Sequence, residues 1–188
     1  MGSGRGQTRR VQAGGPEPSK PKKAVLTMRS LKNGTREYRR NGALHRGDGG
    51  PAVLRADGTK EWYQNGALHR IGGPAIECAD GTREWYRNGA LHREDGPAFE
   101  HAGGNKEWWL DNLQHRVGGP AIESPNGNQE WYQGGKLHRE DGPAIEHPDG
   151  TGTYYLEGKE VNEEGIIEIM VRKYEKSMQR LALGKVTF

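Results

Sequence analysis

Histidine, tryptophan and arginine recur at one spacing along most of the chain. The dipeptide His-Arg begins at residues 45, 69, 92, 115 and 138, which define repeats 1 to 5, and an aromatic residue lies seven positions before each histidine. Imidazoles with carboxylates can bind metals, and aromatic side chains with interleaved arginines can bind single-stranded nucleic acid. A catalytic site instead needs one singular combination of nucleophile, base and orienting group. Because the chain offers the same modest set of side chains five times, we predict no enzymatic activity, no catalytic residue and no cofactor.

The repeated histidines allow two interpretations. Repeats 1, 3 and 5 have an aspartate three positions after the histidine (His45 and Asp48, His92 and Asp95, His138 and Asp141), which would suit a metal site in alternate repeats. The interpretation we favour is structural, with each histidine packed on the facing tryptophan and fixing a turn by hydrogen bonds, and without a metal. The residues assigned to structure are Trp62, Trp85, Trp108, Trp131, His69, His92, His115 and His138.

Turn dipeptides between short extended segments predict β-hairpins. Asn65-Gly66 is typical of a two-residue turn that pairs Tyr63 with Leu68 and Gln64 with Ala67. Continued further, this hairpin would place an ion pair between Glu61 and Arg70. At Asp80-Gly81 a turn with a glycine bulge is favoured, because it opposes Glu77 to Arg83 rather than to Glu84.

The chain divides into three regions. Leu, Ile, Val and Phe make up only 28 of the 188 residues, so a large conventional core is not expected. Residues 1–30 carry seven basic side chains and one acidic one, and we expect a disordered basic arm there. Residues 31–160 form the repeat array, and residues 161–188 an amphipathic helix and tail. Apolar residues at helical spacing predict this helix (Ile167, Met170, Val171, Tyr174, Met178 and Leu181), with Asn162 as its N-cap and Gly184 as its stop.

The predicted fold is all-β: an antiparallel β-hairpin solenoid of about 23-residue repeats with a C-terminal capping α-helix. Trp-Tyr-x-Asn-Gly-x-Leu-His-Arg-x-Asp-Gly-Pro-Ala resembles a MORN repeat in its aromatic residue, its Asn-Gly-x-x-His segment (41–45, 65–69, 88–92) and its closing Asp-Gly. The departure follows the histidine, where MORN repeats usually have His-Gly-x-Gly. This indicates a divergent variant, of the kind in phage, giant-virus and bacterial antitoxin-like proteins. The resemblance implies one hairpin per repeat and protein binding, sometimes phospholipid binding, without catalysis.

The expected function is that of a non-enzymatic protein-binding repeat scaffold, and the resemblance adds an inhibitor of a protein partner, of viral, phage or antitoxin type. Candidate partner-binding residues are Trp109, Leu110, Asp111, Ile71, Val117, Arg70, Arg93, Arg116 and Arg139. The first alternative is nucleic-acid binding through the arm, by Arg5, Arg9, Arg10, Lys20, Lys22 and Lys23. The second alternative is a peripheral phospholipid-binding scaffold, which the lack of an apolar anchor disfavours.

Location and self-association follow from other features. A single cysteine, Cys78, excludes an internal disulfide, and no apolar segment approaches the roughly 18 residues of a membrane span. We expect a cytoplasmic protein, in the host cytoplasm if it is viral. A homodimer could form through open sheet edges or through the C-terminal helix.

Overall fold

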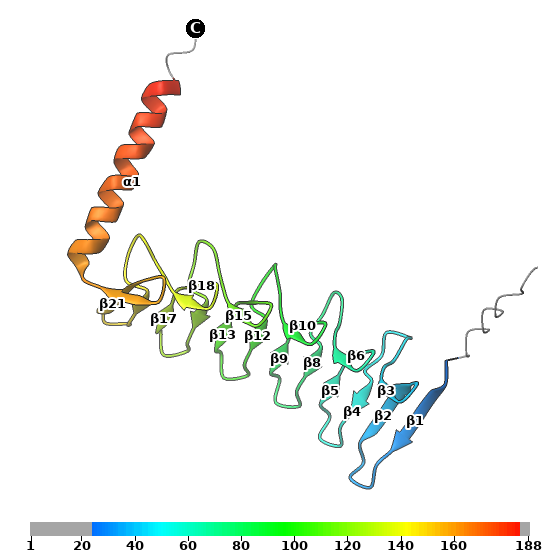
Figure 1. Cartoon of the computed structure of the whole chain (residues 1–188). Helices are drawn as coiled ribbons and strands as arrows, with labels where there is room; N and C mark the ends of the chain where they lie inside the picture. Colours follow the sequence, from blue (N-terminus) through cyan, green and yellow to red (C-terminus); the bar gives the residue numbers. More distant parts are fainter. Residues whose placement is uncertain (1–23, 185–188) are drawn as a thin grey trace, which may run out of the picture.

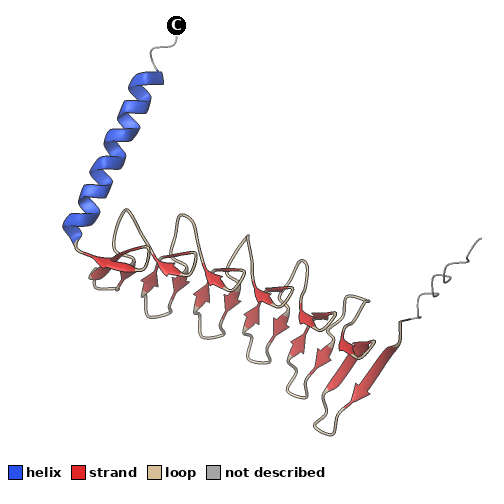
Figure 2. Ribbon diagram, in the orientation of Figure 1, coloured by secondary structure: helices blue, strands red, loops and turns tan. Residues whose placement is uncertain are grey.

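The structure, a computed structural model, describes residues 24–184. It is an elongated array of short antiparallel strands that ends in one helix (Figures 1 and 2). A 14-stranded sheet runs along the whole array. In spatial order its path is β1 (Leu26–Ser30), β2 (Arg36–Arg40), β4 (Val53–Leu54), β5 (Lys60–Glu61), β8 (Ile76–Glu77), β9 (Arg83–Glu84), β12 (Phe99–Glu100), β13 (Lys106–Glu107), β16 (Ile122–Glu123), β17 (Gln129–Glu130), β20 (Ile145–Glu146), β21 (Gly152–Leu156) and β22 (Lys159–Val161), with β3 (Ala43–Leu44) paired to β2.

The long sheet takes one hairpin from each repeat, and its register is the predicted one. Glu77 opposes Arg83 and Glu100 opposes Lys106, which confirms the bulged turn. Gly81 adopts a φ of +95°, the left-handed conformation that the bulge needs. The carboxylate of Asp80 accepts a hydrogen bond from the backbone N–H of Thr82 at 2.8 Å and so closes the turn.

A second, smaller hairpin stands on each of repeats 2 to 5. These hairpins are β6 (Tyr63–Gln64) with β7 (Ala67–Leu68), β10 (Tyr86–Arg87) with β11 (Ala90–Leu91), β14 (Trp109–Leu110) with β15 (Leu113–Gln114), and β18 (Tyr132–Gln133) with β19 (Lys136–Leu137). The predicted pairing of Tyr63 with Leu68 is confirmed. Each repeat therefore has two hairpins, whereas the MORN resemblance implied one.

The tryptophan of each repeat lies at the corner between its two hairpins. In repeat 2 the N–H of Trp62 donates to the carbonyl of Ala75 in the direction of the long sheet. The carbonyl of Trp62 accepts from the N–H of His69 on the small hairpin. One residue thus satisfies hydrogen bonds in two ladders, and the chain leaves the long sheet at that point.

The most buried side chains form a row of alanines. Ala52, Ala75, Ala98, Ala121 and Ala144 are each 0% exposed and follow the proline of each repeat. Trp62 is also buried, whereas Trp85, Trp108 and Trp131 are half-buried. The array therefore has a thin core in which alanine sets the close approach of neighbouring segments and one face of each tryptophan completes the packing.

Helix α1 (Glu163–Gly184) follows the last strand, and the predicted all-β hairpin solenoid with a C-terminal helix is confirmed. Asn162 caps the helix as predicted, since its side-chain oxygen accepts from the N–H of Gly165 at 3.0 Å. Ile166, 2% exposed, packs the first turn onto the end of the array. Beyond this turn the helix projects away from the sheet (Figure 1).

The predicted boundary of the basic arm is wrong at its C-terminal end. Leu26–Ser30 form strand β1, which pairs with β2 along its whole length, Met28 opposite Tyr38. This segment suits a strand because apolar side chains alternate with polar ones and β2 offers it an otherwise open edge. The remaining part of the predicted arm, residues 1–23, lies outside the described residues, as do residues 185–188 of the predicted tail.

Candidate functional site

The conspicuous surface of the array is the row of loops that begin at each His-Arg dipeptide. We call them the His-Arg loops, which span residues 69–74 in repeat 2. In every repeat the arginine lies over the aromatic ring eight positions before it, with its Cζ atom 3.7–4.1 Å from the ring centroid. A guanidinium over an aromatic face gains both cation–π attraction and dispersion. The arginine thus covers the face of the tryptophan that the sheet leaves open.

Each of these arginines also anchors its own loop. In repeat 2 the guanidinium of Arg70 donates to the carbonyl of Pro74 at 3.0 Å and to the carboxylate of Glu77 at 2.7 Å. The same two contacts recur at Arg93, Arg116 and Arg139. The predicted ion pair of Arg70 with Glu61 is therefore wrong. The chain leaves the long sheet at Trp62. The side chain of Arg70 then lies across the indole of Trp62 and reaches Glu77 on β8. The four arginines predicted to bind a partner are all occupied within their own repeats.

The histidines fix turns, as predicted, but they fix the turn of the following repeat. Nδ1 of His45 accepts from the backbone N–H of Asn65, twenty positions later, at 3.1 Å. His69, His92 and His115 accept equivalently from the first turn residue of the next small hairpin, and His138 accepts from the first turn residue of β21–β22. The expected packing of histidine on tryptophan is replaced by the arginine stack. Each histidine instead links one repeat to the next.

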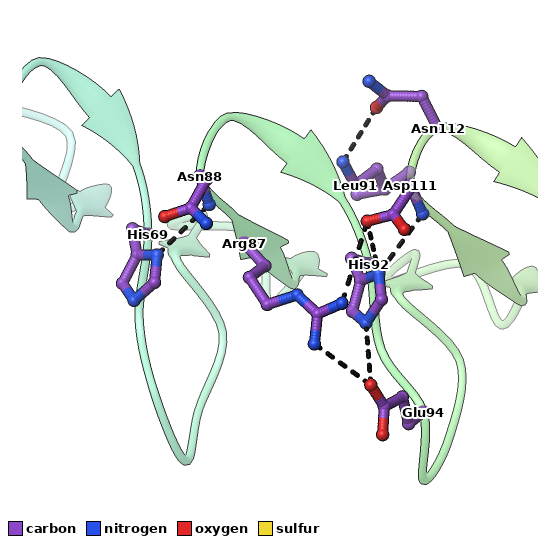
Figure 3. Close-up of polar contacts among 8 residues, drawn as sticks. All are labelled: His69, Arg87, Asn88, Leu91, His92, Glu94, Asp111 and Asn112. Atoms are coloured by element: carbon purple, nitrogen blue, oxygen red, sulfur yellow. Dashed lines mark hydrogen bonds and ion pairs between the residues drawn. The ribbon is translucent and has the colours of Figure 1, made fainter.

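Repeats 3 and 5 surround this histidine with carboxylates, whereas repeats 2 and 4 do not. In repeat 3, Nδ1 of His92 lies 2.8 Å from Asp111 and Nε2 lies 3.3 Å from Glu94, which also accepts from Arg87 at 3.0 Å (Figure 3). His138 in repeat 5 has Glu157 and Glu140 in the same places. His69 has the N–H of Asn88 as its partner (Figure 3). Asp111, predicted to bind a partner, is thus part of this acidic surrounding, and its side chain stays exposed.

Trp109, predicted to bind a partner, is half-buried and makes a contact within its own repeat. In repeats 2, 3 and 5 a tyrosine hydroxyl donates to the glutamate two positions before it, at 2.9–3.1 Å. The indole N–H of Trp109 donates to Glu107 at 2.9 Å in the same way. Leu110, beside it, is half-buried and lies opposite Leu113 in the small hairpin.

The three tyrosines carry raised pKa values. Burial, together with the adjacent carboxylate that accepts the hydroxyl proton in a hydrogen bond, raises the pKa of Tyr63, Tyr86 and Tyr132 to about 12. The neutral phenol is favoured, because a phenolate would lie beside a glutamate with little water to screen it. These tyrosines therefore serve as hydrogen-bond donors and not as bases.

Ile71 and Val117 are the most exposed large apolar side chains of the described residues, at 88% and 80%. They immediately follow the loop arginine in repeats 2 and 4. The same position holds Glu94 in repeat 3 and Glu140 in repeat 5. With two strands per repeat in the long sheet, successive loops are about 10 Å apart, so Ile71 and Val117 are separated by roughly 20 Å with acidic side chains between them.

Open grooves lie between neighbouring loops. The groove between repeats 2 and 3 has a volume of about 400 Å³ and is lined by Ile71, Trp85, Tyr86 and Glu94 among others. The next has about 380 Å³, with Trp108, Leu110 and Val117 in its lining. The last has about 660 Å³ and is completed by Met170, Lys173 and Tyr174 of α1. Both exposed aliphatic residues thus stand at grooves with aromatic linings.

Sequence reasoning did not single out every exposed residue of the His-Arg loops. It missed Glu94 and Glu140, although their alternation with Ile71 and Val117 was visible at one position of the repeat. The six basic residues predicted for nucleic-acid binding all lie outside the described residues. Between residues 24 and 184 no group of three or more histidine, cysteine or acidic side chains is arranged to hold a metal. No helix in the same range is long and apolar enough to cross a membrane.

Neither the scan against protein-family models nor the search of curated proteins finds a match to this chain. The resemblance to MORN repeats therefore stays a prediction.

Proposed function

We propose that this protein is a non-enzymatic repeat scaffold that binds another protein through its row of His-Arg loops. The observation that carries the proposal is the exposure of Ile71 and Val117 at the tips of these loops. Neither side chain has a structural task there, since the arginine and the proline carbonyl close the loop. An aliphatic residue that is almost fully exposed gains nothing in folding, and it becomes favourable when a partner covers it.

The side chains exposed on the His-Arg loops indicate what kind of surface the partner has. Two aliphatic contacts roughly 20 Å apart flank the exposed carboxylates of Glu94 and Asp95. The surface fits a partner that presents apolar side chains at both ends and basic or hydrogen-bond-donating groups between them. The MORN resemblance supports the same class of function, and an inhibitor of its partner is one form that this function can take.

The test compares capture of partners from a lysate of the source cells by three immobilised full-length proteins. They are the wild type, the double variant Ile71→Ser/Val117→Ser, and the control Val25→Ser/Leu26→Ser, which alters exposed aliphatic residues at the far end of the array. We expect a discrete protein to be retained at high salt by the wild type and the control and lost by the loop variant. Retention by all three would overturn the loop row as the binding surface.

Nucleic-acid binding through the arm remains the alternative proposal, and the same experiment separates it. Such binding is dominated by phosphate contacts, so it weakens steeply with salt and disappears after nuclease treatment. A captured partner that is sensitive to both treatments and indifferent to Ile71 and Val117 would favour the arm. Peripheral phospholipid binding would appear as retention on anionic vesicles in place of a protein partner.

A further inference from the structure

Strand β1 is the edge of the long sheet at the end of the array opposite α1 (Figure 1). All five of its residues are exposed, Leu26 to 69% and Met28 to 58%. Among residues 24–184, no strand lies beyond it. Natural sheets often protect an exposed edge with a proline or a bulge, but β1 contains no proline and pairs with β2 in a continuous register. The edge of β1 is therefore open to an added strand.

The backbone hydrogen bonds of β1 show which of its groups face this edge. The carbonyl of Val25 accepts from the N–H of Asn41 at 2.9 Å, and the N–H of Leu31 donates to the carbonyl of Thr35 at 2.8 Å. In an antiparallel pair, the backbone groups of every second residue point to the partner strand. Those of the even-numbered residues of β1 therefore point away from β2, at Leu26, Met28 and Ser30.

A groove of about 560 Å³ lies on the face of β1 that carries Leu26 and Met28. Met28 opposes Tyr38 across the sheet, and Arg46 lies over the ring of Tyr38. In repeat 3 the equivalent stack borders a groove whose other wall is the His-Arg loop of repeat 2. In repeat 1 this wall is β1. The apolar side chains of β1 thus line a groove directly beside the open strand edge.

The charges around β1 are mostly positive. Residues 24–56 carry seven basic side chains and two acidic ones, whereas residues 57–162 carry ten basic and eighteen acidic ones. The two acidic side chains are paired with Arg39 and Arg46. Four further cations are exposed and form no ion pair with a described residue: Arg29, Lys32, Arg36 and Arg40. A segment that binds here should therefore be acidic.

Three other occupants fit the edge less well. Residues 1–23 of this chain contain six basic side chains and one acidic one, so this end of the array repels them. A second copy of β1 brings the same basic surroundings with it. A nucleic acid is attracted by the cations, but its phosphate backbone has no alternating donors and acceptors for a strand edge and no aliphatic group for Leu26 and Met28.

We propose that β1 binds an acidic segment of another protein, which adds to the long sheet as an extended strand. Aliphatic residues of the segment lie over Leu26 and Met28 in the groove, and its backbone pairs with the open edge. Acidic residues alternate with them and point to the opposite face, where Arg29 lies. This surface is separate from the loops of Ile71 and Val117, so the inference does not rest on the function proposed for those loops.

The first test uses a fluorescein-labelled peptide of about eight residues in which valine and glutamate alternate, long enough to cover β1. Its binding to the full-length protein is measured by fluorescence polarisation. We expect saturable binding that weakens with salt. A peptide with lysine in place of glutamate should bind at least about tenfold more weakly. A peptide with the same residues in two blocks has no aliphatic row on one face, and equal binding of the block and alternating peptides would overturn the proposal.

The second test asks whether the backbone of the peptide pairs with β1. Two further peptides are N-methylated at every valine or at every glutamate. In an extended strand the N–H groups of the valines point to one edge and those of the glutamates to the other, so only one set faces β1. One methylated peptide should bind like the unmodified peptide, and the other should bind at least about tenfold more weakly. Equal affinities for the two would contradict strand addition.

The third test alters the protein. Since the N–H of Met28 points away from β2, Met28→Pro removes no hydrogen bond of the sheet, and circular dichroism should show an intact array. This variant should bind the peptide at least about tenfold more weakly. The loop variant Ile71→Ser/Val117→Ser is the control and should bind like the wild type, which separates this proposal from that for the loops. Unchanged binding to Met28→Pro would overturn the inference. Self-association of the wild type that Met28→Pro abolishes, or displacement of the peptide by single-stranded oligothymidylate, would assign the edge to a second copy or to nucleic acid and would also overturn it.

Discussion

Repeats 2 and 4 differ from repeats 3 and 5 in how the His-Arg loop is closed. In repeats 3 and 5 the Nε atom of Arg93 or Arg139 donates to an aspartate two positions later, at 2.8 Å in both. In repeats 2 and 4 the position of that aspartate holds Gly72 or Gly118, with a φ of +76° or +78°. One loop is closed by a carboxylate and the other by a backbone conformation that glycine allows.

The difference shows which positions of the repeat are free to serve function. The aromatic ring, the arginine, the proline carbonyl and the glutamate interact in the same way in repeats 2 to 5. The residue after the arginine is isoleucine, glutamate, valine and glutamate in turn, without a change in these contacts. A position that tolerates such different side chains is not needed for packing, and the loop row can therefore vary its chemistry while the fold persists.

The largest effect should come from substituting the tryptophan, which has the same role in both kinds of repeat. We expect Trp85→Ala in repeat 3 and Trp108→Ala in repeat 4 to lower the free energy of unfolding by similar amounts, about 2–4 kcal/mol each, somewhat less than for a fully buried tryptophan because both side chains are half-buried. Each loses the packing face and the arginine stack. Urea unfolding followed by circular dichroism measures both. A large loss in one repeat and a small loss in the other would mean that the two kinds of repeat have different cores.

An intermediate effect should separate the two loops. Gly118→Ala puts a side chain at a positive φ with open space around it, so the cost is backbone strain, about 1–2 kcal/mol. Asp95→Ala removes an exposed ion pair in repeat 3 and should cost less. Gly118→Asn is the control, because asparagine tolerates this conformation better than alanine does. If both variants lose the same free energy of unfolding in urea, the positive φ of residue 118 is not the cause of the loss.

The smallest effect concerns alkaline pH and sets repeat 4 apart. Tyr63, Tyr86 and Tyr132 have pKa values of about 12 in the folded protein, above the ordinary value of 10.0. Their contribution to stability is therefore present below pH 10 and lost as the pH rises from about 10 to 12. Repeat 4 has Trp109, which does not ionise in this range.

Thermal unfolding between pH 8 and about 12 tests this expectation. The triple variant Tyr63→Phe/Tyr86→Phe/Tyr132→Phe should start with a lower Tm at neutral pH, because three hydrogen bonds are lost. Its Tm should then fall less steeply with pH than that of the wild type. Parallel curves for the two proteins would contradict the role assigned to the tyrosines.

Sequence reasoning predicted the local structure better than the side-chain partners. Turn dipeptides and charge pairing were enough for the register of both hairpins, because both depend on residues only a few positions apart. The partner of Arg70 was wrong because the hairpin does not continue as one ribbon past Trp62. The hydrogen-bond partner of each histidine could not be predicted from the sequence either, since it lies about twenty positions away and depends on how the repeats stack. The apolar spacing in α1 was visible in the sequence, but the exposure of these side chains became clear only in the structure, where Ile166 is buried at the end of the array.

The histidine contacts all run in one direction along the chain. Each histidine holds a turn that lies about twenty residues later in the chain, never one that lies earlier. During synthesis the chain emerges from its N-terminus, so every new turn meets a histidine that is already in place. We therefore expect the repeats to form in order from the N-terminus during synthesis, with β21–β22, whose turn is held by His138, as the last hairpin before the helix.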